Sequence, residues 1–137
     1  MRRVTPVIVA AAGLLVGLDI VGALANRPLG FPYPSLGVVS LVVYFTVGLY
    51  GSWRAGFTVG ALSAITVGLL DATAGPLAAW MVGPGPVRQT FTEPGVFAYG
   101  IAVVTATAAA TGGLGALVGT WLERRRAFRS GTSAVSR

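Results

Sequence analysis

The stretch AGFTVGALSAITVGLLDATAGPLAAWM, residues 55–81, decides the fold, because it is long and almost entirely apolar. A single carboxylate, Asp71, interrupts it. A helix needs about 20 apolar residues to cross a hydrocarbon core about 30 Å thick. Outward from this stretch, runs of the same kind occupy residues 4–25, 36–52 and 96–122. They are too long and too continuous for the alternating strands of a membrane barrel. We therefore predict an all-α integral membrane protein built as a four-transmembrane-helix bundle.

Composition supports this class and excludes several functions. Of the 137 residues 54% are hydrophobic and only 10% are charged, whereas soluble domains carry about 25% charged residues. The chain has no Cys and no His, which removes thiolate nucleophiles and the commonest general base and metal ligand. It also carries no phosphate-binding loop and no nucleophile elbow. We expect no enzyme, no cofactor, no metal site and no nucleic-acid partner.

Arginine positions predict the orientation. All ten basic residues are Arg, and the spans place eight on one side and only Arg27 and Arg88 on the other. The positive-inside rule makes the arginine-rich side cytoplasmic, so both termini are expected inside. Arginine without lysine, in a chain rich in Ala, Gly, Val and Pro, indicates a GC-rich prokaryote, and we expect a multi-pass protein of its plasma membrane. The eight are Arg2, Arg3, Arg54, Arg124, Arg125, Arg126, Arg129 and Arg137.

The connecting segments define the domain limits. Residues 26–35 hold three prolines and predict an extended surface loop, and residues 83–95 form the longest polar link. Pro76 lacks the amide that would bond to Ala72, so it should kink or end the third helix. We assign residues 1–129 to the transmembrane domain and residues 130–137 to a disordered cytoplasmic tail.

The first span has a second interpretation, as a secretory signal. The chain opens with MRR, continues with an apolar stretch and carries the small-residue sequence ALA at 23–25. An uncleaved helix is the simpler account, since the run is long enough to span and three further spans follow.

The sequence also allows the interpretation that two helical hairpins form a weak internal repeat. Asp19 and Asp71 occupy similar places in the first and third spans, and Gly-Ser-Trp at 51–53 matches Gly-Thr-Trp at 119–121. Such a repeat would relate the two hairpins by an axis along the membrane normal. Matches this few also arise by chance.

Asp19 and Asp71 are the candidate ion or proton site. At 1.5 Å per residue both lie about 24–26 Å from the inner boundary, in helices that run in the same direction. Intramembrane carboxylates are costly and mark ion pathways. The alternative is purely structural, with Asp19 reaching water or Arg27 and Asp71 bonding near the break at Pro76 with help from Thr73.

Small residues at a spacing of four form a packing groove on the third span. Gly56, Gly60, Ala64 and Gly68 would let another backbone approach closely. That neighbour is a helix of the same bundle or a second copy of the chain. Tyr44, in the middle of the second span, should find a backbone carbonyl or a threonine as hydrogen-bond partner.

The basic segment after the fourth span is a candidate for lipid contact. Arg124, Arg125 and Arg126 should anchor the helix and contact anionic lipid headgroups. With the bilayer itself, these headgroups are the expected partners, together with a homo-oligomer or another membrane protein.

Two functions follow from these features. The leading expectation is a non-catalytic structural or accessory subunit that packs against itself or a membrane partner. The alternative is an oligomeric proton- or cation-coupled transporter or channel that uses Asp19 and Asp71.

Overall fold

The structure, a computed structural model, describes residues 4–29, 36–82 and 93–132. These ranges contain four helices: α1 (Thr5–Leu29), α2 (Leu36–Ala55), α3 (Phe57–Val82) and α5 (Pro94–Thr132). Each is long and apolar enough to cross a membrane. The all-helical architecture expected from the sequence is therefore confirmed, and four candidate spans suggest a multi-pass membrane protein.

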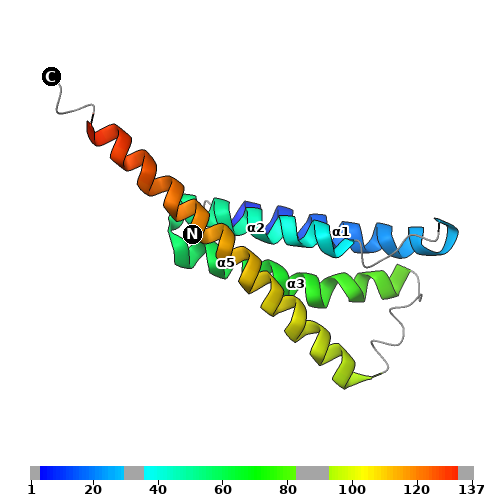
Figure 1. Cartoon of the computed structure of the whole chain (residues 1–137). Coiled ribbons are helices and arrows are strands. Elements are labelled where there is room, and N and C mark those ends of the chain that lie inside the picture. The colour runs from blue at the N-terminus through cyan, green and yellow to red at the C-terminus, as the bar shows by residue number, and fades with distance from the viewer. Residues whose placement is uncertain (1–3, 30–35, 83–92, 133–137) are drawn as a thin grey trace.

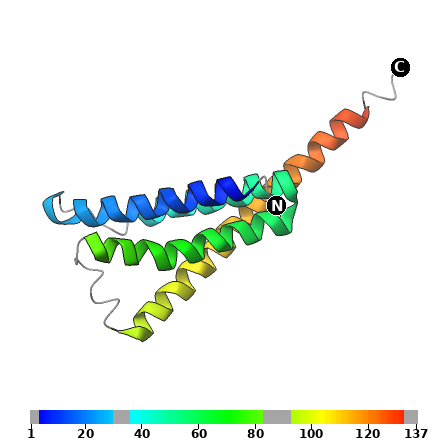
Figure 2. The same cartoon turned by 180° about the vertical axis from the view of Figure 1, so that it is seen from behind.

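The helices form a bundle with two different ends. α1, α2 and α3 run side by side, while α5 crosses them at a slant (Figures 1 and 2). We call the end with the α2–α3 connection the turn end, and the end where α2 and α5 begin the loop end. At the turn end Gly56 has a φ of +89°, a conformation open to glycine, and it joins α2 to α3 directly. Beyond this end the last part of α5 projects away from the bundle (Figure 1).

Close backbone contacts hold α2, α3 and α5 together toward the turn end. A Cβ added to Gly48 of α2 would overlap the backbone of Gly112 of α5. One added to Gly60 of α3 would overlap the Gly48 carbonyl and Ser52. In a membrane, where apolar burial does not drive association, such close approach supplies much of the attraction. α1 packs mainly on α3 and adds Ala11 and Leu15 to the buried core.

Two helices pass through prolines at which the sequence predicts a loop or a break. α1 continues to Leu29, so the expected loop at residues 26–35 is wrong over residues 26–29. α3 continues through Pro76 to Val82 rather than ending there. A proline removes one helical hydrogen bond, and in an apolar helix the remaining bonds have no water to replace them.

α5 is also longer than its apolar run. It begins at Pro94 and reaches Thr132, although the run covers residues 96–122. The tail that we expected to be disordered from residue 130 is helical as far as Thr132. Arginine is a good helix former, and its charge is favourable near a helix C-terminus. These two effects account for the extension.

Candidate cation site and the cavity beside it

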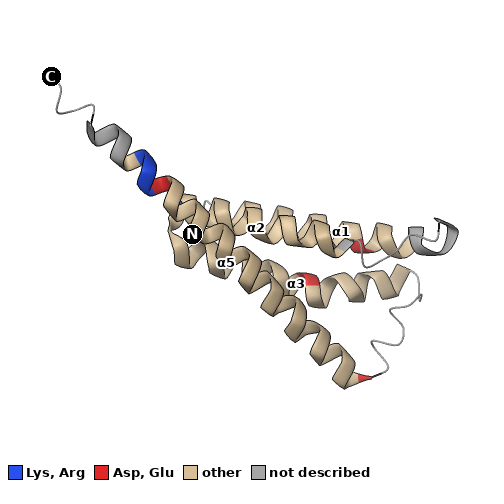
Figure 3. Cartoon of the chain, viewed as in Figure 1, with Lys and Arg blue, Asp and Glu red and all other residues tan. Residues whose placement is uncertain are grey.

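The structure brings Asp19 of α1 and Asp71 of α3 together at Gly75. A Cβ added to Gly75 would overlap the carboxylate of Asp19 and would lie 3.6 Å from Oδ1 of Asp71. Gly75 follows Asp71 by one helical turn, so the two share a face of α3. The missing side chain leaves the space into which Asp19 reaches. Figure 3 shows the two acidic positions on α1 and α3 in the loop-end half of the bundle.

Two hydroxyl groups of α2 complete the polar cluster. Tyr44, only 2% exposed, donates a hydrogen bond to Oδ2 of Asp71. Ser40, one turn earlier on α2, lies within hydrogen-bonding reach of both Asp71 and Tyr44. Oxygen atoms from three helices thus gather at one place, and we call Asp19, Ser40, Tyr44 and Asp71 the acidic cluster.

A backbone carbonyl adds to the acceptors nearby. Because Pro76 has no N–H, the carbonyl of Ala72 lacks its usual helical donor. Ala72 and Pro76 both line the cavity that adjoins the acidic cluster. Carboxylate, hydroxyl and carbonyl oxygens are the ligand types that bind hard cations.

The cavity lies between α5 and the other helices and has a volume of about 320 Å³. Asp19, Ser40, Tyr44 and Asp71 form its polar side. Ligand sites of this kind occupy about 300–1,000 Å³ and combine apolar walls with a few polar groups. The other lining residues are Gly37, Leu41, Ala72, Pro76, Phe97, Gly100, Ile101, Val103, Val104 and Thr107.

Three of the four predicted groove residues lie inside the bundle. Gly60 packs on α2, while Ala64 and Gly68 pack on α5 at Gly112 and Ala108. Gly56 is in the turn, and the position of its Cβ has no neighbour within 4 Å among the described residues.

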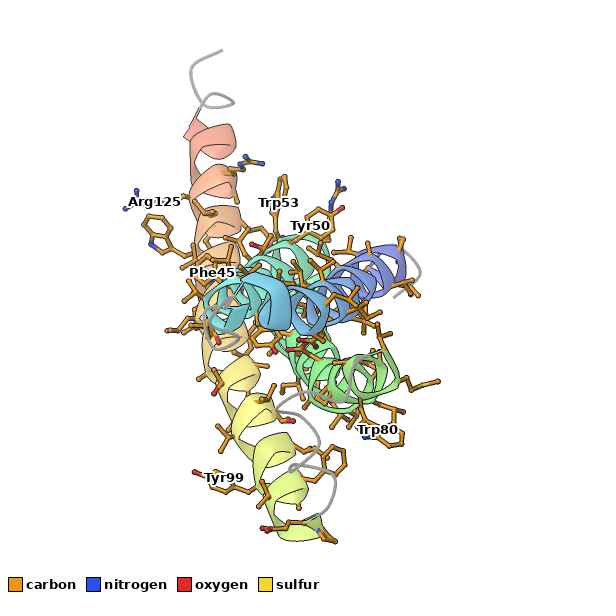
Figure 4. All side chains as sticks on the ribbon, turned by 90° about the vertical axis from the view of Figure 1, so that its right-hand side faces the viewer. Phe45, Tyr50, Trp53, Trp80, Tyr99 and Arg125 are labelled. Atoms are coloured by element: carbon orange, nitrogen blue, oxygen red, sulfur yellow. The ribbon has the colours of Figure 1, made fainter. Side chains whose placement is uncertain are left out.

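The predicted headgroup residues lie at the projecting end of α5. The Arg125 guanidinium stands 3.8 Å above the centre of the Trp121 ring, and that of Arg126 lies 4.9 Å from the Trp53 ring. Arg54 lies 5.5 Å from the same Trp53 ring, so the end of α2 and the end of α5 share one aromatic contact. Figure 4 shows Arg125, Trp53 and Tyr50 at this end, and Tyr99 far from them. Arg124 lines a shallow pocket with Trp121.

Sequence reasoning placed Asp19 and Asp71 at one depth but missed their neighbours. The partner of Tyr44 is Asp71, rather than the carbonyl or threonine that we expected. Thr73 donates back to the Leu69 carbonyl at 2.7 Å, so its hydroxyl is occupied within α3. The side chain of Arg27, the suggested partner of Asp19, lies outside the described residues. The sequence did contain a signal for the contact between Tyr44 and Asp71, because the two residues lie at similar distances from the loop end of their helices.

No protein-family model, curated protein or solved structure matches the chain. In the part of the chain that the structure describes, no group of three or more His, Cys, Asp or Glu side chains could hold a metal ion. The acidic cluster and its cavity are the candidate functional site.

Proposed function

We propose that the protein binds a cation at the Asp19–Asp71 pair and couples this binding to transport across the membrane. The bound species is a proton or another cation. One observation carries the proposal: carboxylates from two separate helices meet at Gly75, whose missing side chain makes the contact possible.

Energetic considerations support a cation at this place. A carboxylate in the hydrocarbon costs about 2.5–3.5 kcal/mol at the centre and less toward the interface. Two carboxylates that meet add their mutual repulsion to this cost. A proton or cation between them removes the repulsion and part of the desolvation penalty. Asp19 and Asp71 are therefore better suited to binding positive charge than to stabilising the bundle.

Their position is also suitable for alternating access. If the arginine-rich turn end faces the cytoplasm, as the positive-inside rule predicts, the acidic cluster lies in the outer half of the membrane. The cavity then gives the carboxylates a route toward the outer side. A transporter would expose the same carboxylates to the inner side in a second conformation.

Flux measurements in proteoliposomes test the proposal. Purified wild type is reconstituted, and proton, Na⁺ and K⁺ gradients are imposed one at a time while internal pH and ion content are followed. We expect flux for at least one cation, and its loss to background in the Asp19→Asn, Asp71→Asn double variant. Glu123→Gln is the matched control, because Glu123 is an exposed acid of α5 outside the cavity.

A second variant tests the geometry without removing a charge. Gly75→Ala keeps both acids but places a methyl group where the Asp19 carboxylate lies. We expect at least a tenfold loss of flux, with Gly13→Ala, whose Cβ position is open, behaving as wild type. If wild type and the double variant both give only background flux for every cation, the transport function is refuted. A structural or accessory subunit then becomes the better proposal, and crosslinking and mild-detergent pull-downs would test it.

A further inference from the structure

The cavity is much larger than an inorganic cation requires. Ca²⁺ or Mg²⁺ is held by six or more oxygens at about 2.0–2.6 Å, in a closed shell. Here about 320 Å³ adjoin the carboxylates, and the acidic cluster occupies only one side. The cavity therefore has room for a ligand larger than an inorganic cation.

The opposite wall of the cavity is apolar and comes largely from α5. Phe97, Ile101 and Val104 of α5 form this wall, and Leu41 of α2 adds a further apolar side chain to the lining. The one hydroxyl on the α5 wall, that of Thr107, donates to the Val103 carbonyl at 2.8 Å. This wall therefore offers hydrocarbon surface, with no strong polar group to hold water or a sugar.

The rim of the cavity reaches the lateral surface of the bundle, which faces away from the other helices. Val103 is 44% exposed and Leu41 is 36% exposed, and both line the cavity. On helices that span a membrane, this surface meets lipid tails. A hydrophobic molecule dissolved in the bilayer can thus enter from the side.

From the cavity and its two unlike walls we infer that the substrate is a lipophilic organic monocation, a quaternary or protonated amine. Its charged nitrogen lies at Asp19 and Asp71, and its hydrocarbon groups fill the space against Phe97, Ile101 and Val104. The inference depends on the proposed function, because it names what the same carboxylates bind.

A series of tetraalkylammonium ions tests the substrate class directly. Binding of tetramethyl-, tetraethyl-, tetrapropyl- and tetrabutylammonium to the purified wild-type protein is measured by calorimetry in a non-ionic detergent. Apolar walls predict that affinity rises at least tenfold from tetramethyl- to tetrapropylammonium. The Asp19→Asn, Asp71→Asn double variant should lose at least tenfold in tetrapropylammonium affinity.

Gly100 offers a variant that changes only the space. It lines the cavity on α5, and a Cβ there would meet no described atom within 4 Å. Gly100→Leu should lower tetrapropylammonium affinity at least tenfold and tetramethylammonium affinity less than twofold. Gly113→Leu is the matched control, because Gly113 also lies on α5 with an open Cβ position but does not line the cavity.

The outcomes separate this inference from the proposed function. Equal affinity for all four tetraalkylammonium ions would overturn the inferred substrate class. Affinities in Gly100→Leu that equal those of wild type would do the same. Either result would leave the proposed ion flux through Asp19 and Asp71 untouched. Unchanged tetrapropylammonium binding in the double aspartate variant would overturn the inferred substrate class as well, since the charge would then not be held at the carboxylates. Chain-length selectivity that disappears in Gly100→Leu and persists in Gly113→Leu would support it. Absence of ion flux would instead count against the proposed function.

Discussion

The turn-end half and the loop-end half of the bundle use small residues in opposite ways. Toward the turn end, Gly48, Gly60 and Gly112 bring backbones of α2, α3 and α5 into direct contact, and a Cβ at any of them would overlap a neighbour. Toward the loop end, Gly37 and Gly100 line the cavity, and a Cβ at either would meet open space. The first three glycines close the contact between helices, whereas the two that line the cavity leave space open.

The slant of α5 connects the two halves. A helix that contacts its neighbours closely at one end and crosses them at an angle must separate from them at the other (Figures 1 and 2). The cavity beside the acidic cluster is the result of that separation. Tight packing at the turn end therefore determines where the opening lies.

The largest loss of stability is expected from a substitution in the closely packed turn-end half. Gly112→Leu puts a side chain against the Ala64 Cβ. This atom is fixed to the α3 backbone, so it cannot move aside as the end of a flexible side chain does. Overpacking of this kind costs about 1–3 kcal/mol, and occasionally more. Thermal unfolding in detergent, followed by size-exclusion chromatography, should show a strong loss of the folded species.

The neighbouring glycine supplies the control for this comparison. Gly113 has an open Cβ position among the described residues. Leucine has a helix propensity better than glycine by roughly 0.8 kcal/mol, so Gly113→Leu should be as stable as wild type or slightly more stable. Equal destabilisation by both variants would contradict the distinction between a packed and an open face of α5.

A smaller effect is expected at the acidic cluster. Tyr44→Phe removes the hydroxyl that donates to Asp71 but keeps the buried ring. Hydrogen bonds between membrane helices contribute about 0.6 kcal/mol on average, with values up to about 1.7. We expect a loss of roughly 1 kcal/mol in unfolding free energy, measured by titration with a denaturing detergent. Tyr99→Phe, on an α5 side chain that is 72% exposed, should change it by much less.

The smallest effect is expected at the aromatic contacts of the turn end. Trp53→Leu removes the ring shared by Arg54 and Arg126. Cation–π contacts at exposed sites contribute about 0.5–1 kcal/mol, so the same titration should show a loss in this range. Trp53→Phe keeps an aromatic face and should recover part of it. A loss above that of Tyr44→Phe would show that this end contributes more than its cation–π contacts.

The sequence carried enough information for the helices and for placing the two acids at one level of the bundle. Apolar runs give span number and direction, and the fixed rise per residue then places Asp19 and Asp71 at one level. The rotation of each helix about its axis could not be predicted, because spans apolar on all sides have no polar face to indicate the interior. That rotation decides whether Asp19 meets Gly75, and whether Tyr44 reaches Asp71.

Local patterns were weaker guides where long-range geometry decides. The spacing of Gly60, Ala64 and Gly68 predicted close packing, but it could not say that α2 and α5 would fill the groove. Nor could Pro76 reveal that α3 would continue past it. These features depend on which helices meet, and a single segment does not contain that information.

The oblique α5 also has the geometry of a lever. With Gly112 as the pivot, Phe97 at the cavity lies 15 residues away, an arm of about 22 Å at 1.5 Å per residue. A rocking of about 5° around that pivot would displace Phe97 by about 2 Å, while the contacts at the pivot would shift very little. The width of the mouth is thus governed by an angle set elsewhere in the bundle, so the cavity could be gated without a separate lid.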